Sequence, residues 1–167
     1  VIAVERIIKL FAENGIHPLV LGTTGESSSI NEKESLKLVE TSVKVKGTNQ
    51  CIYVGLVGNQ VDNLIKRGNQ YIALGADCVV ATLPSYYGLS ENQMLLFYQT
   101  LADKISGPVM MYNIKATTQM SIPLEVVREL SKHPNIWGLK DSERDLERMK
   151  FCIDWYKENS NFSFFCG

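Results

Sequence analysis

Short apolar runs alternate with stretches of helical patterning along the whole chain, and this alternation constrains the fold more than any other feature of the sequence. The runs lie roughly 30 residues apart, which is the length of one strand–helix unit. We expect six strands, at residues 19–21, 52–54, 79–81, 109–111, 137–139 and 162–165.

Helical patterning fills the intervals between these runs. Apolar residues recur at the i, i+3, i+4 and i+7 positions of one helix face within 4–11, 61–72, 94–105 and 146–156. Residues that favour helix ends agree with this pattern. Asn31 with Glu34 resembles a capping box, Pro123 suits a first helical turn, and Gly15 and Gly75 follow helices.

Strands that are apolar on both faces and alternate with helices predict a parallel sheet covered by helices, and therefore an α/β fold. Two architectures fit this pattern, an open doubly wound sheet and a (β/α)8 barrel. Six strands do not close an eight-stranded barrel, which typically needs about 250 residues. The open sheet lacks support as well, because neither G-x-G-x-x-G nor G-x-x-x-x-G-K-[ST] occurs. The pattern alone leaves both architectures open, within a single domain at residues 1–167.

Charge and residue usage exclude several classes of function. The 17 basic and 18 acidic residues nearly balance, which removes any global electrostatic case for binding nucleic acid or an acidic membrane. The two histidines lie too far apart for metal-ligand spacing, and the four cysteines form no C-x-x-C pair, so we expect reduced thiols. No apolar run approaches the length of a membrane helix, and no charged-then-apolar leader opens the chain. We expect a cytoplasmic protein and, because the chain begins at Val1 in a helical stretch, part of a longer one.

Lys140 stands where the apolar run 137–139 ends. Functional groups of parallel α/β folds gather at such places, where strands end and loops begin. Apolar neighbours penalise the charged form of an amine and favour the neutral form, which can attack a ketone to give a Schiff base. Alternatively, a lysine at a strand end packs its stem and keeps its head in water.

Two glycines flank two threonines after the first expected strand, at Gly22, Thr23, Thr24 and Gly25. The glycines allow a tight turn that directs backbone N–H groups and hydroxyls into one small space, which suits an anion such as a carboxylate. Small polar residues are equally ordinary in a simple turn from a strand to a helix.

Tyrosines occupy two other positions near strand ends. Tyr112 follows the fourth run, where a phenol can pass protons or can pack with its hydroxyl satisfied. Tyr86 and Tyr87 lie on a loop bounded by Pro84 and Gly88, where they suit either a pocket or a contact between subunits.

Taken in order, four motifs resemble those of the dihydrodipicolinate synthase / N-acetylneuraminate lyase family of pyruvate-handling class I aldolases. They are Gly-Thr-Thr-Gly-Glu at 22–26, the double tyrosine at 86–87, Tyr-Asn-Ile at 112–114 and Gly-Leu-Lys-Asp-Ser at 138–142. The resemblance covers essentially the whole chain and implies a (β/α)8 TIM barrel. The chain is expected to be an incomplete portion of that barrel, without its first strand and its C-terminal part.

The resemblance implies roles for particular residues. Lys140 would form the Schiff base with a 2-oxo acid, and Tyr112 would carry protons to and from the reacting atoms. Thr23 and Thr24, with the backbone at Gly22 and Gly25, would hold the carboxylate of pyruvate.

The resemblance also implies an assembly and a set of partners. Thr23 would link Tyr112 to Tyr87, which in this family reaches into the site of a neighbouring subunit. The implied assembly is a homo-oligomer, either a dimer or a tetramer. The implied partners are pyruvate and an aldehyde, and the implied chemistry uses no metal and no organic cofactor.

The loop after Tyr112 departs from the family pattern. Thr117, expected in the substrate pocket, stands where synthases of lysine biosynthesis carry an arginine, and Lys115 and Gln119 replace a proline and a glycine. A bidentate arginine–carboxylate contact is strong and specific, and threonine cannot replace it. Lys115 either supplies a displaced positive charge or is a solvated loop residue.

We therefore expect a lyase or aldolase that acts on sugar-derived 2-oxo acids or on a 4-hydroxy-2-oxo acid. Two alternatives stay open at this point. One is dihydrodipicolinate synthesis itself, and the other is a barrel that binds a 2-oxo acid without turnover.

Overall fold

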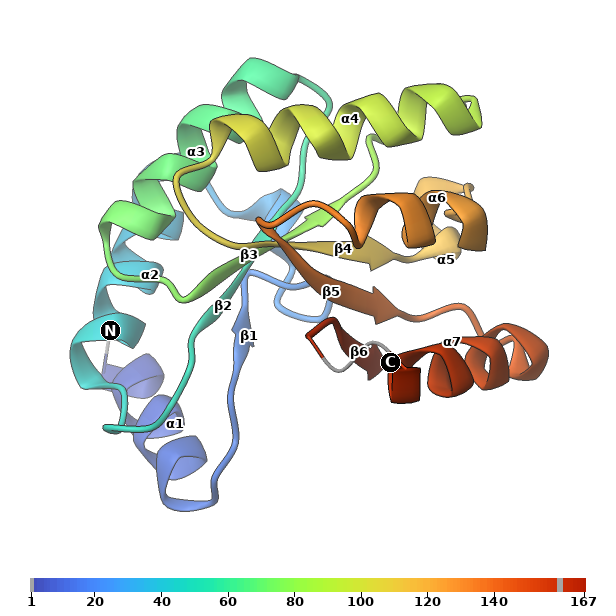
Figure 1. Ribbon diagram of the computed structural model, residues 1–167. Helices are drawn as coiled ribbons and strands as arrows, with labels where there is room; N and C mark the ends of the chain where they lie inside the picture. The colour runs from blue at the N-terminus through green and yellow to red at the C-terminus, as the bar shows by residue number, and fades with distance from the viewer. Residues whose placement is uncertain (1, 159–160) are drawn as a thin grey trace.

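A parallel sheet of six strands forms the centre of the computed structural model, which describes residues 2–158 and 161–167 (Figure 1). Each strand pairs in parallel with the next one along the chain. All six expected strands are present, with small shifts at their ends. They are β1 (Leu19–Val20), β2 (Tyr53–Leu56), β3 (Cys78–Thr82), β4 (Val109–Asn113), β5 (Ile136–Asp141) and β6 (Ser163–Cys166).

One helix precedes β1 and others connect the strands that follow, and they include the four stretches with an apolar stripe in the sequence. None of the helices in the described part of the chain is long and apolar enough to cross a membrane. A short 3-10 turn, η1 (Ser27–Ser29), follows β1. The helices are α1 (Ile2–Glu13), α2 (Glu32–Val45), α3 (Val61–Ala73), α4 (Glu91–Lys104), α5 (Lys115–Thr118), α6 (Leu124–Leu130) and α7 (Leu146–Glu158).

Asn31 caps α2, although its contacts differ from those of a capping box. The Asn31 side-chain oxygen accepts a hydrogen bond from the backbone N–H of Glu34 at 2.9 Å, and its amide donates to the Glu34 carboxylate at 2.7 Å. In a capping box the glutamate would instead reach back to the backbone. The complete capping box lies at the start of α4, between Ser90 and Gln93.

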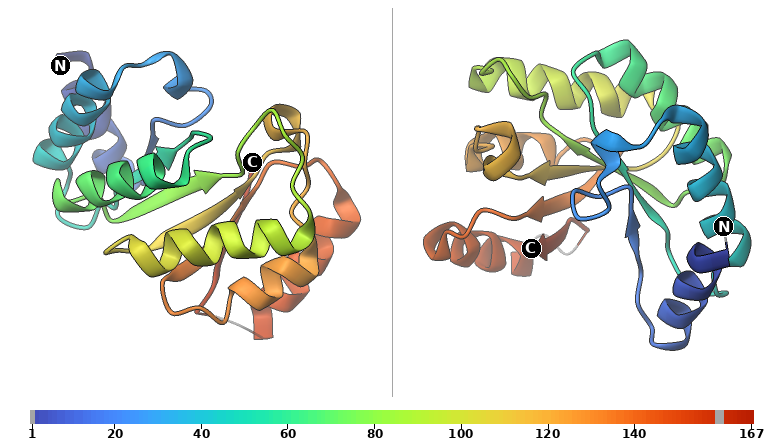
Figure 2. Two further views of the ribbon diagram at one scale, coloured as in Figure 1. Left: turned by 90° about the horizontal axis from the view of Figure 1, so that it is seen from above. Right: turned by 180° about the vertical axis from the view of Figure 1, so that it is seen from behind.

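The strand order decides between the two architectures that the sequence left open. A doubly wound sheet reverses its order at a switch point and carries helices on both faces. Here the order runs from β1 to β6 without reversal. The sheet curls, and the helices lie along its outer, convex side (Figures 1 and 2). The fold is therefore part of a (β/α)8 barrel, which confirms the expectation drawn from the family resemblance.

Buried apolar side chains form two clusters, one on each face of the sheet. The larger cluster lies between the sheet and the helices and includes Val79, Met111 and Leu139. Burial raises the pKa of the Cys78 thiol, which faces the concave side, to about 12 and so keeps it protonated. The concave cluster consists of Cys78, Val80, Met110, Tyr112 and Ile114.

Gly55 in β2 allows the backbone at Leu21, just after β1, to pass close to β2. A Cβ at Gly55 would lie 1.9 Å from the carbonyl oxygen of Leu21, so a larger residue leaves no room for this approach. Leu21 adopts a φ of 54°, in the left-handed region, and β1 ends one residue sooner than the apolar run suggests. The loop that carries Thr23 therefore begins close to the inner side of the sheet.

Candidate active site

A bulge at Trp137 sets the faces of the side chains in β5. Val109 of β4 pairs with Ile136, but the next residue, Met110, pairs with Gly138, which makes Trp137 the extra residue. The Trp137 side chain is 52% exposed. Because successive side chains of a strand alternate between faces, one extra residue exchanges the two faces for the rest of β5.

After the bulge, Tyr112 pairs with Lys140 and Asn113 pairs with Asp141. Tyr112 belongs to the concave cluster, so Lys140 projects onto the concave face beside it. Asn113 and Asp141 project toward the helices. Both pairs stand at the C-terminal ends of their strands, the edge at which barrel enzymes place their chemistry.

The Lys140 amine lies over the ring of Tyr112, with Nζ 3.8 Å from the ring centroid. Nζ also donates a hydrogen bond to the Ser142 hydroxyl at 3.0 Å. Gly167 closes this corner, because a Cβ there would lie 3.1 Å from Nζ and 2.1 Å from the Ser142 oxygen. The half-buried amine is thus held between an aromatic ring and a hydroxyl.

The Tyr112 hydroxyl has a pKa below its usual value of 10. Burial acts in the opposite direction and raises this pKa, but hydrogen bonding to Lys140, Ser142 and Thr23, together with the Lys140 charge, outweighs burial. Thr23 therefore joins the same cluster from the loop after β1. A lowered pKa moves the phenol toward neutral pH, and an acid–base group works best when its pKa is near the working pH.

Ser142 is the member of this cluster that reasoning from the sequence did not single out. It lies within the motif at 138–142 and two residues after Lys140. Side chains two residues apart in an extended segment point to the same side. That spacing is the signal that identifies Ser142.

A buried polar network holds the opposite face of β4 and β5 together. Asn113 Nδ2 donates to Asp141 Oδ1 and to Glu143 Oε2, both at 3.0 Å, and Asn113 Oδ1 accepts from the backbone N–H of Ile122 at 3.0 Å. Arg148 of α7 donates from Nε to Asp141 Oδ2 at 2.6 Å. Because Asn113 and Asp141 directly follow the two inward-facing residues, the network fixes the two strand ends against each other.

Glu143 extends this network to the loop after β4. Burial raises the pKa of Glu143, but hydrogen bonds from Ser121, Asn113 and Lys115 outweigh burial and hold the pKa below its ordinary value of 4.5. The Lys115 ammonium lies 3.2 Å from the carboxylate. The Lys115 charge is therefore paired within the protein.

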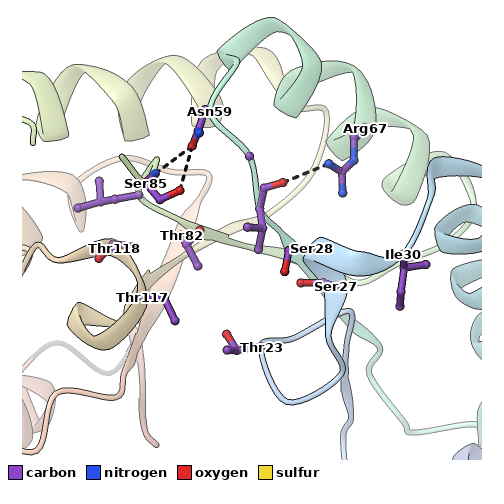
Figure 3. A pocket seen from close by; sticks show the side chains of 13 residues that line it. Thr23, Ser27, Ser28, Ile30, Asn59, Arg67, Thr82, Ser85, Thr117 and Thr118 are labelled. Atoms are coloured by element: carbon purple, nitrogen blue, oxygen red, sulfur yellow. Dashed lines mark hydrogen bonds between the residues drawn. The ribbon is translucent and has the colours of Figure 1, made fainter. Parts of the chain in front are cut away.

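A cavity of about 420 Å³ opens beside Thr23 (Figure 3). Thr23 connects this cavity to the cluster because it also interacts with Tyr112. Lys140 lines a smaller cavity of about 270 Å³ on the concave face. Within residues 2–158 and 161–167, no group of three or more His, Cys, Asp or Glu side chains is arranged to hold a metal ion. The larger cavity has a lining rich in hydroxyl groups, from Thr23, Ser27, Ser28, Thr82, Ser85, Thr117 and Thr118.

Thr23 is the residue of the threonine loop that the structure brings against Tyr112. The N–H of Glu26 donates to the Thr23 carbonyl at 3.0 Å and closes the turn. Thr24 and Gly25 are exposed, and Gly22 is partly buried.

Tyr87 lies apart from the Lys140–Tyr112 cluster within the single chain. Its side chain is 76% exposed, and its ring packs edge-on against Tyr86 with 4.8 Å between centroids. It lines a separate groove of about 510 Å³, together with Leu96 and Phe97 of α4. The structure therefore unites Lys140, Tyr112 and Thr23 and leaves Tyr87 outside.

Geometry and sequence together define a class of protein. It is part of a (β/α)8 barrel in which a lysine and a tyrosine face each other at the C-terminal ends of neighbouring strands. Residues 2–167 match the model of the Dihydrodipicolinate synthetase family, and the chain belongs to that family. The resemblance found in the sequence is thereby confirmed.

Curated relatives agree with this assignment. The chain is 33% identical over 147 residues to 4-hydroxy-tetrahydrodipicolinate synthase of Macrococcus caseolyticus, and the aligned region covers 87% of this chain and 50% of the relative. It is 33% identical over 152 residues to 4-hydroxy-tetrahydrodipicolinate synthase 2 of Halalkalibacterium halodurans, and this aligned region covers 90% of this chain and 52% of the relative. The chain thus spans about half the length of the curated relatives it matches.

Solved structures share the fold. A dihydrodipicolinate synthase of Acinetobacter baumannii complexed with pyruvate gives a TM-score of 0.90 at 25% identity, covering 98% of this chain and 56% of that one. The 4-hydroxy-tetrahydrodipicolinate synthase of Methylacidiphilum fumariolicum SolV gives 0.90 at 26% identity, covering 99% and 55%. These matches support the description of the chain as a partial barrel.

Glu143→Gln should destabilise the protein in a pH-dependent way. The folded pKa of Glu143 lies below its ordinary value of 4.5, so the ionised carboxylate stabilises the fold above that pH. This contribution is lost as the pH falls through the folded pKa. We expect the free energy of unfolding to drop by about 1–2 kcal/mol at pH 7, and the gap from wild type to shrink well below pH 4.5.

Urea unfolding of both proteins at neutral and acidic pH measures this gap. Glu129→Gln is the matched control, because it breaks an exposed pair with Lys132 and should change stability by less than about 0.5 kcal/mol. A gap between wild type and Glu143→Gln that stays constant from neutral to acidic pH would contradict the assignment.

Proposed function

We propose that the intact protein is a class I lyase or aldolase that makes or breaks a carbon–carbon bond between pyruvate and an aldehyde through a Schiff base at Lys140. The observation that carries this proposal is the Lys140 amine over the Tyr112 ring and bonded to Ser142. A snorkelling lysine would carry its amine out to water, whereas this amine lies on the concave face. In this proposal residues 1–167 are one domain, a portion of the barrel.

Lys140 acts as the nucleophile in its neutral form. Its amine attacks the C2 carbonyl of pyruvate, and the resulting carbinolamine loses water to give an iminium. The cation withdraws electrons from the adjacent methyl group, so loss of a methyl proton yields an enamine. The enamine carbon attacks the aldehyde carbon, and water then hydrolyses the new iminium to release the product and free Lys140. The reverse sequence breaks the bond.

Tyr112 moves the protons that these steps require. Its phenol protonates the carbinolamine hydroxyl as that group leaves as water. The resulting phenolate takes up the methyl proton as the enamine forms, and the restored phenol then protonates the aldehyde oxygen as the carbon–carbon bond forms. The lowered pKa of Tyr112 and its interaction with Thr23 support this role. Thr23 and Thr24, with the backbone of Gly22 and Gly25, bind the pyruvate carboxylate in this proposal.

Thr117 favours an aldehyde other than that of dihydrodipicolinate synthesis. It lines the hydroxyl-rich cavity and carries no charge at the position where synthases of lysine biosynthesis have an arginine, so a carboxylate placed as in those synthases finds no cation there. The names of the relatives keep 4-hydroxy-tetrahydrodipicolinate synthesis as the second candidate. The two candidates differ only in the aldehyde, so a panel of aldehydes offered with pyruvate separates them.

The proposal also covers cofactors and cellular location. The proposed reaction needs no metal and no organic cofactor, because the iminium itself is the electron sink. The proposal likewise includes the cytoplasmic location expected from the sequence. The four cysteines, all free thiols, are in keeping with such a reducing compartment.

An oligomer built through the Tyr86–Tyr87 loop is a further part of this proposal. Both rings are exposed, Tyr86 at 87% and Tyr87 at 76%, and they border an apolar groove with Leu96 and Phe97. Exposed aromatic groups of this kind are enriched at protein interfaces. In the proposed assembly Tyr87 reaches the neighbouring subunit's site rather than its own.

Pyruvate should form a borohydride-reducible adduct at Lys140 in the intact protein, even in the presence of a chelator. Lys140→Arg keeps the positive charge but removes the nucleophile, so it should abolish the adduct while the fold stays intact. Tyr112→Phe should slow adduct formation about 100-fold or more, the usual loss on removing an acid–base group. Mass spectrometry after reduction, with and without pyruvate, measures both effects.

Lys115→Arg is the matched control for this experiment. Lys115 also lies just beyond a strand end, but Glu143 holds its ammonium, so this variant should form the adduct as wild type does. No mass increase on wild type, or an equal increase on Lys140→Arg, would show that Lys140 is not the Schiff-base residue. A barrel that binds a 2-oxo acid without turnover would then be the better account.

Replacing Tyr86 and Tyr87 together by alanine should weaken the assembly, because it removes two exposed aromatic contacts. Sedimentation velocity should show wild type as a dimer or tetramer and the double variant as a smaller species. Tyr156→Ala, which removes a partly exposed tyrosine from α7, should leave the assembly unchanged. The shared-site proposal fails if wild type sediments as a monomer at the concentrations where it is active.

A further inference from the structure

The cavity of about 420 Å³ beside Thr23 has one charged group in its lining, the guanidinium of Arg67 (Figure 3). The other described residues that line it supply hydroxyl, amide, backbone and aliphatic groups and no carboxylate. Its volume lies within the usual range of small-molecule sites. Many hydroxyls with a single cation suit a polar organic anion.

Arg67 is held in place by two hydrogen bonds and has N–H donors to spare. Nη1 donates to the carbonyl of Val57 at 3.1 Å, and Nη2 donates to the hydroxyl of Tyr71 at 3.2 Å. These bonds use two of the five N–H donors of a guanidinium. Nε is buried and has no hydrogen-bond partner within the described residues. The guanidinium is therefore oriented by the protein but not saturated by it.

The charge of Arg67 is not neutralised by a neighbouring carboxylate. The ion pairs found among residues 2–158 and 161–167 do not include Arg67. Lys115, the cation near Thr117, is paired with Glu143 and is not part of the cavity lining. An anion that enters the cavity therefore meets Arg67.

We propose that Arg67 determines substrate specificity by binding an anionic group, carboxylate or phosphate, on the aldehyde partner. This inference rests on the proposed function. In Figure 3, Ser27 and Ser28 lie between Thr23 and Arg67 along the cavity. An aldehyde with its carbonyl near Thr23 extends past these hydroxyls and places its anionic end at the guanidinium.

Matched pairs of aldehydes, offered with pyruvate to the intact protein, test this inference. Succinic semialdehyde and butanal differ by a carboxylate, and glyceraldehyde 3-phosphate and glyceraldehyde differ by a phosphate. Wild type should prefer the charged member of at least one pair, and the pair that responds tells carboxylate from phosphate. Arg67→Gln should lower kcat/KM for that member by about 10- to 100-fold, mainly through KM, and barely change the neutral member.

Lys66→Gln is the matched control. Lys66 is the preceding residue on α3, is exposed, and lies 3.9 Å from Glu32. This variant removes the same unit charge and should leave the preference unchanged. Arg67→Lys should show a reduced preference, because an ammonium cannot reproduce the bidentate contact. Equal losses in Arg67→Gln and Lys66→Gln, or a wild type without charge preference, would overturn the inference.

The pyruvate adduct distinguishes failure of this inference from failure of the proposed function. Arg67→Gln should still form the reducible adduct at Lys140, because the inferred contact is with the aldehyde alone. No adduct on wild type refutes the proposed function. An adduct on both proteins with an unchanged aldehyde preference refutes the role of Arg67 and leaves the function standing. If Arg67→Gln does not fold, Arg67→Lys carries the test: a reduced preference supports the role and an unchanged one contradicts it.

Discussion

One extra residue in β5, Trp137, decides which side chains meet in the candidate site. Without this bulge the two strands would continue in their first register, which would set Tyr112 beside Leu139 and turn Lys140 toward the helices. With the bulge, Lys140 reaches the concave face, and Leu139 joins the core beneath the helices. The buried polar network on the other face then holds the strand ends in this register. The pairing of amine and phenol thus depends on a local irregularity at the start of β5 and on hydrogen bonds on the opposite side of the sheet.

The strand–helix alternation was sufficient to predict all six strands, because strands buried on both faces leave short continuous apolar runs. Helices α2 and α6 were indicated only by the residues at their ends, because α2 buries mainly small polar side chains and α6 is only 7 residues long. Strand order is a long-range property that local patterning does not encode, so the choice of a barrel needed the family resemblance. The predicted end of β1 at residue 21 was wrong for a similar reason. The close approach of Leu21 to Gly55, which ends the strand at Val20, arises only once β1 and β2 have paired.

Strand-end position singled out Lys140, Tyr112 and Thr23 as candidates, and the family resemblance implied their roles. The structure brings these three together. Other residues were not revealed by the sequence, for different reasons. Asn113 meets Glu143 across 30 residues, and Arg67 lies within an amphipathic helix where nothing in the pattern separates it from an ordinary surface arginine. Tyr87 illustrates the opposite case. The resemblance links it to Tyr112 through Thr23, yet within one chain it borders a different groove, so that link requires a second subunit.

In the proposed mechanism, Lys140 and Tyr112 form a Schiff-base site at the C-terminal ends of β5 and β4. A crystal structure of the intact protein, incubated with pyruvate and reduced with borohydride, would show whether Lys140 forms the Schiff base. We expect continuous electron density from Lys140 Nζ to C2 of the ligand, with the ligand carboxylate at the loop that carries Thr23 and Thr24. Density for the adduct on another lysine would contradict it. So would pyruvate bound without a covalent bond while Lys140 points away from Tyr112.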